Sequence, residues 1–250
     1  MSIRAVLLDI GNTLLEYSLD GQWRQFLVRR LEEMHPVVRD LVGPIAITAP
    51  DFAARVGEVI GGQRARDIER RGRSWHFAQR LREGLGTVGL CADAEVLDRL
   101  TEVFYEPIRE CTKPYSDTRE VLDALRSLGI RLAIITNSPW DTPARLLRGD
   151  LERWSIGEFF NAFICSGEVP WRKPNPAFML AAAEAVKARP EECLVVGDKL
   201  EADIAGAVAA GMQSVWMNRA GSTVSSDARQ PDWVVGTLTE VLEILEGSVK

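Results

Sequence analysis

The strongest constraint on the fold is a short apolar run that recurs along the chain and ends each time in small or polar residues. The runs cover residues 3–9, 131–137, 162–166, 193–198 and 214–218. Continuous apolar runs of this length are typical of strands buried on both faces. Helical patterns lie between or after them, at residues 118–128, 176–187 and 201–210. Alternating strands and helices predict parallel pairing through right-handed crossovers, and therefore an α/β, doubly wound sheet.

A long segment interrupts this alternation after the first run. Residues 17–112 contain helix-period patterns at 23–34, 52–60, 73–85 and 94–105, without a convincing buried strand. We therefore expect an inserted all-helical cap domain over residues 17–112, and an α/β core built from residues 1–16 and 113–250. Residues 238–245 are expected to form a closing helix.

Composition narrows the class of protein. The chain has 250 residues, 46% of them hydrophobic, so it is long and apolar enough to bury a core. Its 36 acidic residues outnumber 30 basic ones, which argues against nucleic-acid binding. An uncharged apolar run long enough for a membrane span is missing. Four isolated cysteines and a short apolar start predict a reduced, cytoplasmic protein. The pattern indicates no oligomeric state.

Polar residues gather where the predicted strands end. Asp9 ends the first run, Thr136 lies at the end of the second, and Asp198 ends the fourth, with Asp203 five residues later. Lys173 lies in a proline-rich loop before a helix. Ligands of open parallel sheets bind outside the carboxyl ends of the strands. Acids, a hydroxyl and a lysine converging there would suit a divalent metal and a phosphoryl group.

Four motifs in order resemble the haloacid dehalogenase-like hydrolase superfamily. They are Asp9 to Leu14, Ile134 to Ser138, Lys173-Pro174 and Gly197 to Asp203. The resemblance covers essentially the whole core and implies a Rossmann-like fold. The helical insertion agrees in its position with the subfamily that has a cap after the first motif. The implied activity is Mg²⁺-dependent hydrolysis of a small phosphorylated metabolite, with neither nucleic acid nor membrane as partner.

The resemblance also implies a role for each matching residue. Asp9 would be the nucleophile that forms an aspartyl-phosphate. Asp9, the backbone carbonyl of Gly11 and Asp198 would bind Mg²⁺. Asp203 would support the metal site or orient Lys173.

The remaining matches concern the phosphoryl group. Thr136 and Lys173 would hold it during transfer, and Asn137 would help to bind the substrate. Thr13 would also belong to the substrate site and would order the loop after the nucleophile.

Gly11 departs from the family's phosphatases, which have a second Asp at this position as general acid and base. General acid–base catalysis is typically worth about 10²–10⁴-fold in rate. Either the substrate has a good leaving group, or another group supplies the proton, or the protein is a weak or inactive phosphate-binding or regulatory relative. Dehalogenase and phosphonatase chemistry fit less well, since the former has no use for Asp198 and Asp203, and residues 17–112 contain no Lys. A receiver-like phosphoacceptor would lack the large insertion.

Two features of the loops and the insertion leave alternatives open. Trp140 and Trp171 either line the mouth of the site or pack between loop and core. Residues 64–82 hold seven arginines, which form either a solvated helix face or a patch that attracts an anionic substrate tail. Arg24, Arg29 and Arg30 in the first expected helix allow the same two interpretations.

Overall fold

The fold is built on one parallel sheet, as the sequence predicts. The computed structural model describes residues 3–19, 22–223 and 230–247. Six strands pair in the order β5-β4-β1-β6-β7-β8, and every pairing is parallel. The strands are β1 (Ala5–Leu8), β4 (Arg131–Thr136), β5 (Ala162–Cys165), β6 (Cys193–Gly197), β7 (Gln213–Met217) and β8 (Trp233–Val235). The α/β doubly wound prediction is confirmed.

The register of β1 fixes where the site forms. Leu8 pairs with Ile134 on one side and with Val196 on the other. The residues that follow these three positions therefore emerge at the same carboxyl edge of the sheet. Side chains of successive strand residues point to opposite faces, so β1 buries both faces. Val6 and Leu8 belong to one apolar cluster, whereas Ala5 and Leu7 belong to the other.

Helices cover both faces of the sheet. The face of Val6 packs against α6 (Thr118–Ser127), α7 (Ala144–Arg153) and α10 (Thr239–Leu245). The opposite face packs against α8 (Pro176–Ala185) and α9 (Ala205–Ala209). The expected helix at residues 201–210 is a π-helical turn, η4 (Leu200–Ile204), followed by α9. Short 3₁₀ turns occur at η1 (Pro139–Asp141), η2 (Gly157–Phe159) and η3 (Pro190–Glu192).

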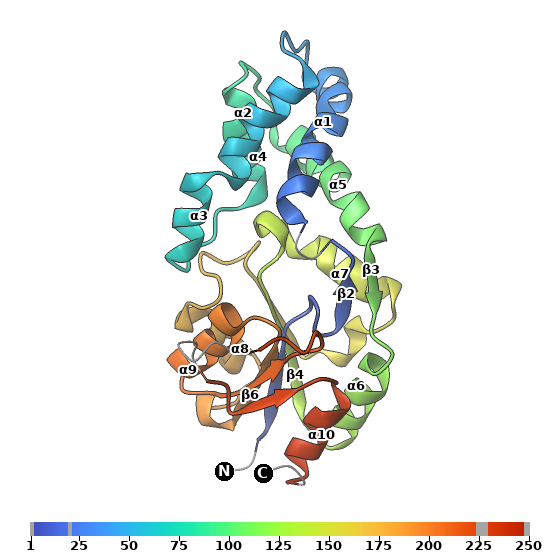
Figure 1. The fold of residues 1–250 in the computed structure, drawn as a ribbon, viewed down its shortest axis with the longest axis vertical. Coiled ribbons are helices and arrows are strands. Elements are labelled where there is room, and N and C mark those ends of the chain that lie inside the picture. Colours follow the sequence, from blue (N-terminus) through green and yellow to red (C-terminus); the bar gives the residue numbers. More distant parts are fainter. Residues whose placement is uncertain (1–2, 20–21, 224–229, 248–250) are drawn as a thin grey trace.

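Five further helices form a separate group at one end of the molecule (Figure 1). This helical unit comprises α1 (Trp23–Leu41), α2 (Ala49–Gly61), α3 (Gln63–Arg70), α4 (Phe77–Gly86) and α5 (Ala94–Glu110). Side chains cap two of the helices, since Thr48 Oγ1 accepts from Asp51 N–H at 3.3 Å and Asp93 Oδ1 accepts from Val96 N–H at 2.8 Å. None of the described helices is long and apolar enough to span a bilayer.

A small two-stranded sheet connects the helical unit to the six-stranded sheet. Strands β2 (Leu15–Tyr17) and β3 (Thr112–Pro114) pair antiparallel. Neither strand was expected from the sequence, nor was β8, because three residues show no measurable alternation. The chain therefore enters and leaves the helical unit through two paired strands.

The helix expected at residues 73–85 is wrong at its start. Helix α4 begins at Phe77, and the segment before it pairs with a loop of the α/β core. Arg73 and Trp171 form an antiparallel bridge, with Ser74 N–H donating to Pro170 O at 3.1 Å and Arg172 N–H donating to Gly72 O at 3.1 Å. These hydrogen bonds satisfy the backbone outside the helix. We call this pairing of residues 72–74 with 170–172 the seam.

Candidate active site

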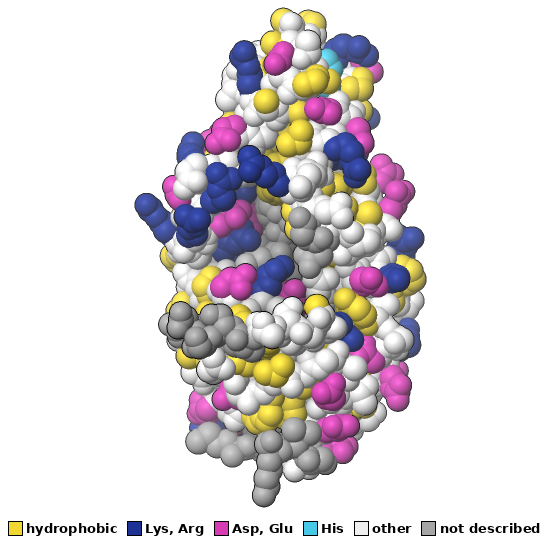
Figure 2. Space-filling view, viewed as in Figure 1, with side chains coloured by type: hydrophobic (Ala, Val, Ile, Leu, Met, Phe, Trp, Pro, Cys, Tyr) yellow, Lys and Arg dark blue, Asp and Glu magenta, His cyan; other side chains and the backbone are white. Residues whose placement is uncertain are grey.

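A cavity of about 640 Å³ lies between the carboxyl edge of the sheet and the helical unit. Figure 2 shows the molecule hollowed at this level. Its lining includes Asp9, Gly11, Thr136, Asn137, Lys173, Asp198 and Asp203. The structure therefore brings together every site residue predicted from the sequence except Thr13.

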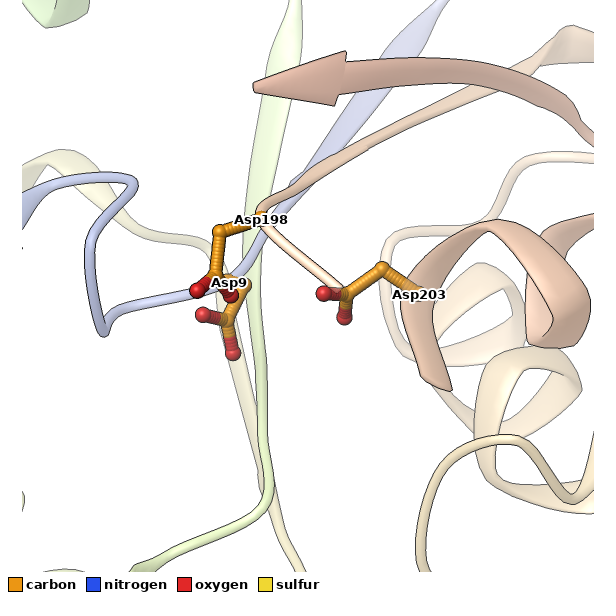
Figure 3. Close-up of side chains that lie close together, drawn as sticks. All are labelled: Asp9, Asp198 and Asp203. Atoms are coloured by element: carbon orange, nitrogen blue, oxygen red, sulfur yellow. The ribbon is translucent and has the colours of Figure 1, made fainter. Parts of the chain in front are cut away.

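Three carboxylates meet on one side of this cavity (Figure 3). Asp9 follows β1, Asp198 follows β6, and Asp203 lies in the π-helical turn η4. One oxygen from each lies within 4.8 Å of the others. Gly197 makes this approach possible, because a Cβ there would lie 2.2 Å from Asp203 Cγ. Carboxylate oxygens at this spacing are the ligands that Mg²⁺ prefers, so the residues present fit a divalent cation.

Lys173 connects two of these acids. Its Nζ lies 2.5 Å from Asp9 Oδ1 and 2.5 Å from Asp203 Oδ1, and donates to Ile135 O at 2.9 Å. Burial by itself lowers the pKa of Lys173, but the charges of Asp203 and Asp9 outweigh it and raise the pKa above its ordinary value. Lys173 therefore stays cationic beside Asp9.

Asp9 and Asp198 both have raised pKa values in this buried, acidic site. Burial raises the pKa of Asp9, and the charge of Lys173 opposes this shift. Burial, followed by the charge of Asp9, raises the pKa of Asp198 to about 7. A bound cation would relieve both effects, since it favours the ionised carboxylates.

Asn137 holds the backbone that carries Lys173. Its Oδ1 accepts from Lys173 N–H at 3.0 Å, and its Nδ2 donates to Lys173 O at 3.1 Å. The side chain expected to bind substrate therefore holds the backbone of Lys173 through both atoms of its amide. Thr136, the last residue of β4, lines the cavity directly.

Thr13 lies outside the cavity lining. Its side chain is fully buried, and its backbone oxygen accepts from Arg219 Nη2 at 3.1 Å. Arg219 is held in turn by Asp117 at 2.9 Å. Thr13 is thus a buried residue of the loop that follows Asp9, and its side chain does not contribute to the cavity lining.

The ring of Tyr17 lies beside the position where the missing acid would stand. An ideal Cβ on Gly11 would lie 3.4 Å from Tyr17 Cε2 and 4.0 Å from Asp9 Oδ2. Both contacts fall close to ordinary van der Waals distance. Gly11 therefore faces the nucleophile with no side chain, and Tyr17 from β2 lies beside it in the lining.

A buried ion network joins the helical unit to the two loops around the site. Asp141 is fully buried, and its Oδ2 accepts from Arg80 Nη2 and from Trp75 N–H, both at 2.9 Å. Arg172 Nη1 lies 3.2 Å from Asp141 Oδ1 and 3.0 Å from Glu69 Oε1. The network thus reaches the residue before Lys173. Sequence alone missed it because its members lie far apart along the chain.

An aromatic cluster forms the wall next to this network. Trp140 stacks on Phe26 at 6.0 Å between ring centroids and meets the ring of Trp23 edge-on at 5.7 Å. Trp140 and Asp141 both have positive φ, at 49° and 56°. Non-glycine residues rarely adopt this conformation, and their packing and ion contacts hold them there. Trp140 lines the cavity, whereas Trp171 lies in the seam.

Comparison with known proteins gives one consistent family. The sequence profile of the haloacid dehalogenase-like hydrolases matches residues 3–211. A phosphoglycolate phosphatase of Pseudomonas putida is 32% identical over 82% of this chain and 78% of its own length. A phosphoglycolate phosphatase of Neisseria meningitidis is 34% identical over 54% of this chain and 57% of its own. A glyceraldehyde 3-phosphate phosphatase of Methanopyrus kandleri is 32% identical, again over little more than half of each chain.

Solved structures agree over nearly the full length. A phosphatase of the same family from Thermococcus onnurineus superposes with a TM-score of 0.67 at 25% identity and covers 98% of this chain and 99% of its own. A 2-haloacid dehalogenase from Pseudomonas syringae superposes with a TM-score of 0.71 at 22% identity, covering 99% and 100%. The latter likeness concerns the fold alone. The sequence alignments with the first curated relatives span only about half to three fifths of those relatives.

Proposed function

The chain belongs to the haloacid dehalogenase-like hydrolase family, and from this premise we propose that it is a Mg²⁺-dependent phosphatase acting on a small phosphate monoester. One observation carries the proposal. Lys173 Nζ lies 2.5 Å from Asp9 Oδ1, beside three carboxylates whose oxygens approach within 4.8 Å. This arrangement provides a nucleophile, a cation for phosphoryl oxygens and oxygen ligands for a metal in one cavity.

The chemistry follows from these positions. A carboxylate oxygen of Asp9 attacks phosphorus, an O–P bond forms, and the bond to the leaving-group oxygen breaks. Lys173 and the hydroxyl of Thr136 hold the phosphoryl oxygens in line with Asp9. Water then attacks the aspartyl-phosphate, which releases phosphate and restores Asp9. Mg²⁺ held by Asp9, Asp198 and the carbonyl of Gly11 would neutralise charge on the phosphoryl group.

Gly11 sets a limit on this reaction. No carboxyl group on residue 11 protonates the leaving oxygen, so departure depends on the acidity of the leaving group itself. Activated esters such as aryl and acyl phosphates should therefore react much faster than alkyl phosphates. The ratio of the two rates should be larger than in family enzymes that have the second Asp.

The helical unit is proposed to be the cap of this enzyme. We assign residues 17–112 to the cap and residues 1–16 and 113–250 to the core. The cavity has walls from both parts, since Trp23 and Arg66 come from the helical unit while Asp9 and Lys173 come from the α/β part. Walls from both parts limit the access of bulk water to the phosphoryl group.

Gly11 also favours a second candidate, a phosphate-binding protein with little turnover. Such a protein would keep the contacts of Lys173 and the carboxylates, and it would bind a phosphoryl analogue without releasing product.

Phosphate release from p-nitrophenyl phosphate, acetyl phosphate and an alkyl phosphate, with and without Mg²⁺, tests the proposal. Asp9→Asn should abolish release, and Asp98→Asn, which changes an exposed acid of the helical unit, should leave it unchanged. Release by the Asp9→Asn protein would refute the assignment of the nucleophile. Mg²⁺-dependent binding of beryllofluoride without release of phosphate from any ester would favour the second candidate.

A further inference from the structure

We propose that the leaving group of the substrate carries a second anionic group, a carboxylate or a phosphate, and that Arg24 and Arg66 bind it. This inference rests on the proposed phosphatase function. Arg24 lies in the first turn of α1 and Arg66 lies in α3, and both line the cavity that contains Asp9. The proposed substrate thus has one anionic end at Asp9 and another at the helical unit.

The first argument is the balance of charge around the cavity. Among the described residues, the acidic ones that line it are Asp9, Glu69, Asp198 and Asp203. Asp9 and Asp203 share Lys173, and Asp198 would bind the metal. Glu69 Oε1 lies 2.9 Å from Arg80 Nη2 and 3.0 Å from Arg172 Nη1, so its charge is already compensated.

Arg24 and Arg66 lack such compensation. Within the described residues, neither guanidinium has a carboxylate at ion-pair distance, and both side chains are exposed. Arg66 donates to Gly61 O at 2.7 Å and to Gln63 Oε1 at 3.2 Å, which are neutral acceptors that hold it beside the cavity. Two uncompensated cations on one wall attract an anion.

The second argument is that one arginine of the tract at residues 64–82 differs from the others in its surroundings. Of the seven arginines, only Arg66 lines the cavity. Arg64 pairs with Glu83 at 3.1 Å, and Arg70 lies 3.9 Å from Asp67. Arg80 is buried in the ion network with Asp141. Arg66 thus faces the cavity, whereas Arg64, Arg70 and Arg80 pair with acidic side chains of the protein. Figure 2 shows Lys and Arg side chains gathered along the rim of the hollow.

The third argument is the apolar part of the cavity lining. Trp23, Leu27 and Trp140 line the same cavity as the two arginines and Asp9, so the body of a ligand held at both ends meets apolar side chains. A cavity of about 640 Å³ is large enough for a leaving group in addition to a phosphoryl group. The arrangement fits a phosphate ester with an apolar body and a distal anion.

A matched pair of substrates tests this inference. The phosphate ester of 3-(4-hydroxyphenyl)propionic acid and the ester of its amide differ in distal charge, while the intervening methylene groups keep the leaving oxygens equally acidic. Wild-type protein should favour the acid in kcat/KM. Arg24→Gln and Arg66→Gln should each reduce that preference about fivefold, an effect expected for a partly exposed charge-assisted contact. Arg70→Gln, an equal change of charge in the same helix, should leave it intact.

A second assay separates this inference from the proposed function. Calorimetry with the corresponding phosphonates measures binding to wild type and to Arg66→Gln without any turnover. Hydrolysis of both esters at equal kcat/KM would overturn the inference and leave the phosphatase assignment standing. Arg66-dependent preference for the carboxylate phosphonate, without hydrolysis of either ester, would support the inference and overturn the function. Equal binding with no hydrolysis would overturn both. A diphosphorylated ester compared with the carboxylate ester then distinguishes the two kinds of distal anion.

Discussion

Asp141→Asn should destabilise the protein far more than the loss of an ordinary charge. The Asp141 side chain is fully buried, and it accepts hydrogen bonds from Arg80, from Trp75 N–H and from Arg172. Its replacement leaves the guanidinium of Arg80, itself completely buried, with only half-exposed Glu69 as an acidic partner. Breaking a buried ion pair by removing one partner costs about 3–5 kcal/mol.

Asparagine removes the charge of residue 141 without changing its backbone conformation. Asp141 has a φ of 56°, and Asn adopts positive φ about as readily as Asp. The substitution therefore adds no backbone strain and keeps the side-chain volume. At about 2–4 °C per kcal/mol for a chain of this size, the melting temperature should fall by roughly 6–20 °C.

Urea unfolding followed by tryptophan fluorescence measures the change in the free energy of unfolding. Asp98→Asn is the matched control, because it removes an equal charge from an exposed pair with Arg145. It should cost less than about 1 kcal/mol. A cost below about 1 kcal/mol for Asp141→Asn as well would refute the reasoning, since the network would then contribute no more than a surface ion pair.

Three further predictions concern the site. Because burial raises the pKa of Asp198 from 3.8 to about 7, the folded protein binds this proton more tightly than the unfolded chain, so stability without metal should fall as pH rises from about 4 to about 7. Mg²⁺ competes with the proton, so its increment to the melting temperature should be larger at about pH 8 than at about pH 6, and equal increments would contradict this. Gly11→Asp should fold, since its Cβ meets Tyr17 at 3.4 Å, and it should raise alkyl phosphate hydrolysis by about 10²–10⁴-fold; no gain would show that the missing acid does not limit the rate. Asn137→Ala should release the backbone of Lys173 and lower kcat about 10- to 100-fold with Mg²⁺ affinity unchanged, and an unaltered kcat would rule out a positioning role.

The sheet and its polar edge could be predicted because they depend on local patterns. Buried strands are apolar throughout, and parallel pairing brings their carboxyl ends to one edge whatever the detailed register. Asp9, Thr136 and Asp198 could therefore be placed at this edge from their positions at the ends of runs, and Lys173 from its loop motif; the cavity lining includes all four. Thr13 is absent from the lining, because a loop residue has no periodic pattern that predicts whether it faces a ligand or the core.

The wall formed by the helical unit could not be predicted in this way. Which arginine faces the cavity depends on the rotation of α3 about its axis, and that rotation is fixed by contacts with residues distant in sequence. Arg64 and Arg66 look equivalent in the sequence, yet only Arg66 lines the cavity. Strands β2 and β3 were missed for a related reason, since each exists only because the other pairs with it.

The seam has a consequence for how molecules reach Asp9. A rigid body joined at two neighbouring points can still rotate about the line through them. Strands β2 and β3 give the helical unit such a rotation axis. The bridge between Arg73 and Trp171 and the buried ion pair between Arg80 and Asp141 add attachments outside this axis and oppose the rotation. Swinging the helical unit open requires rupture of the seam and of the buried ion pair between Arg80 and Asp141. A product too large to leave the closed cavity should therefore escape no faster than these contacts break.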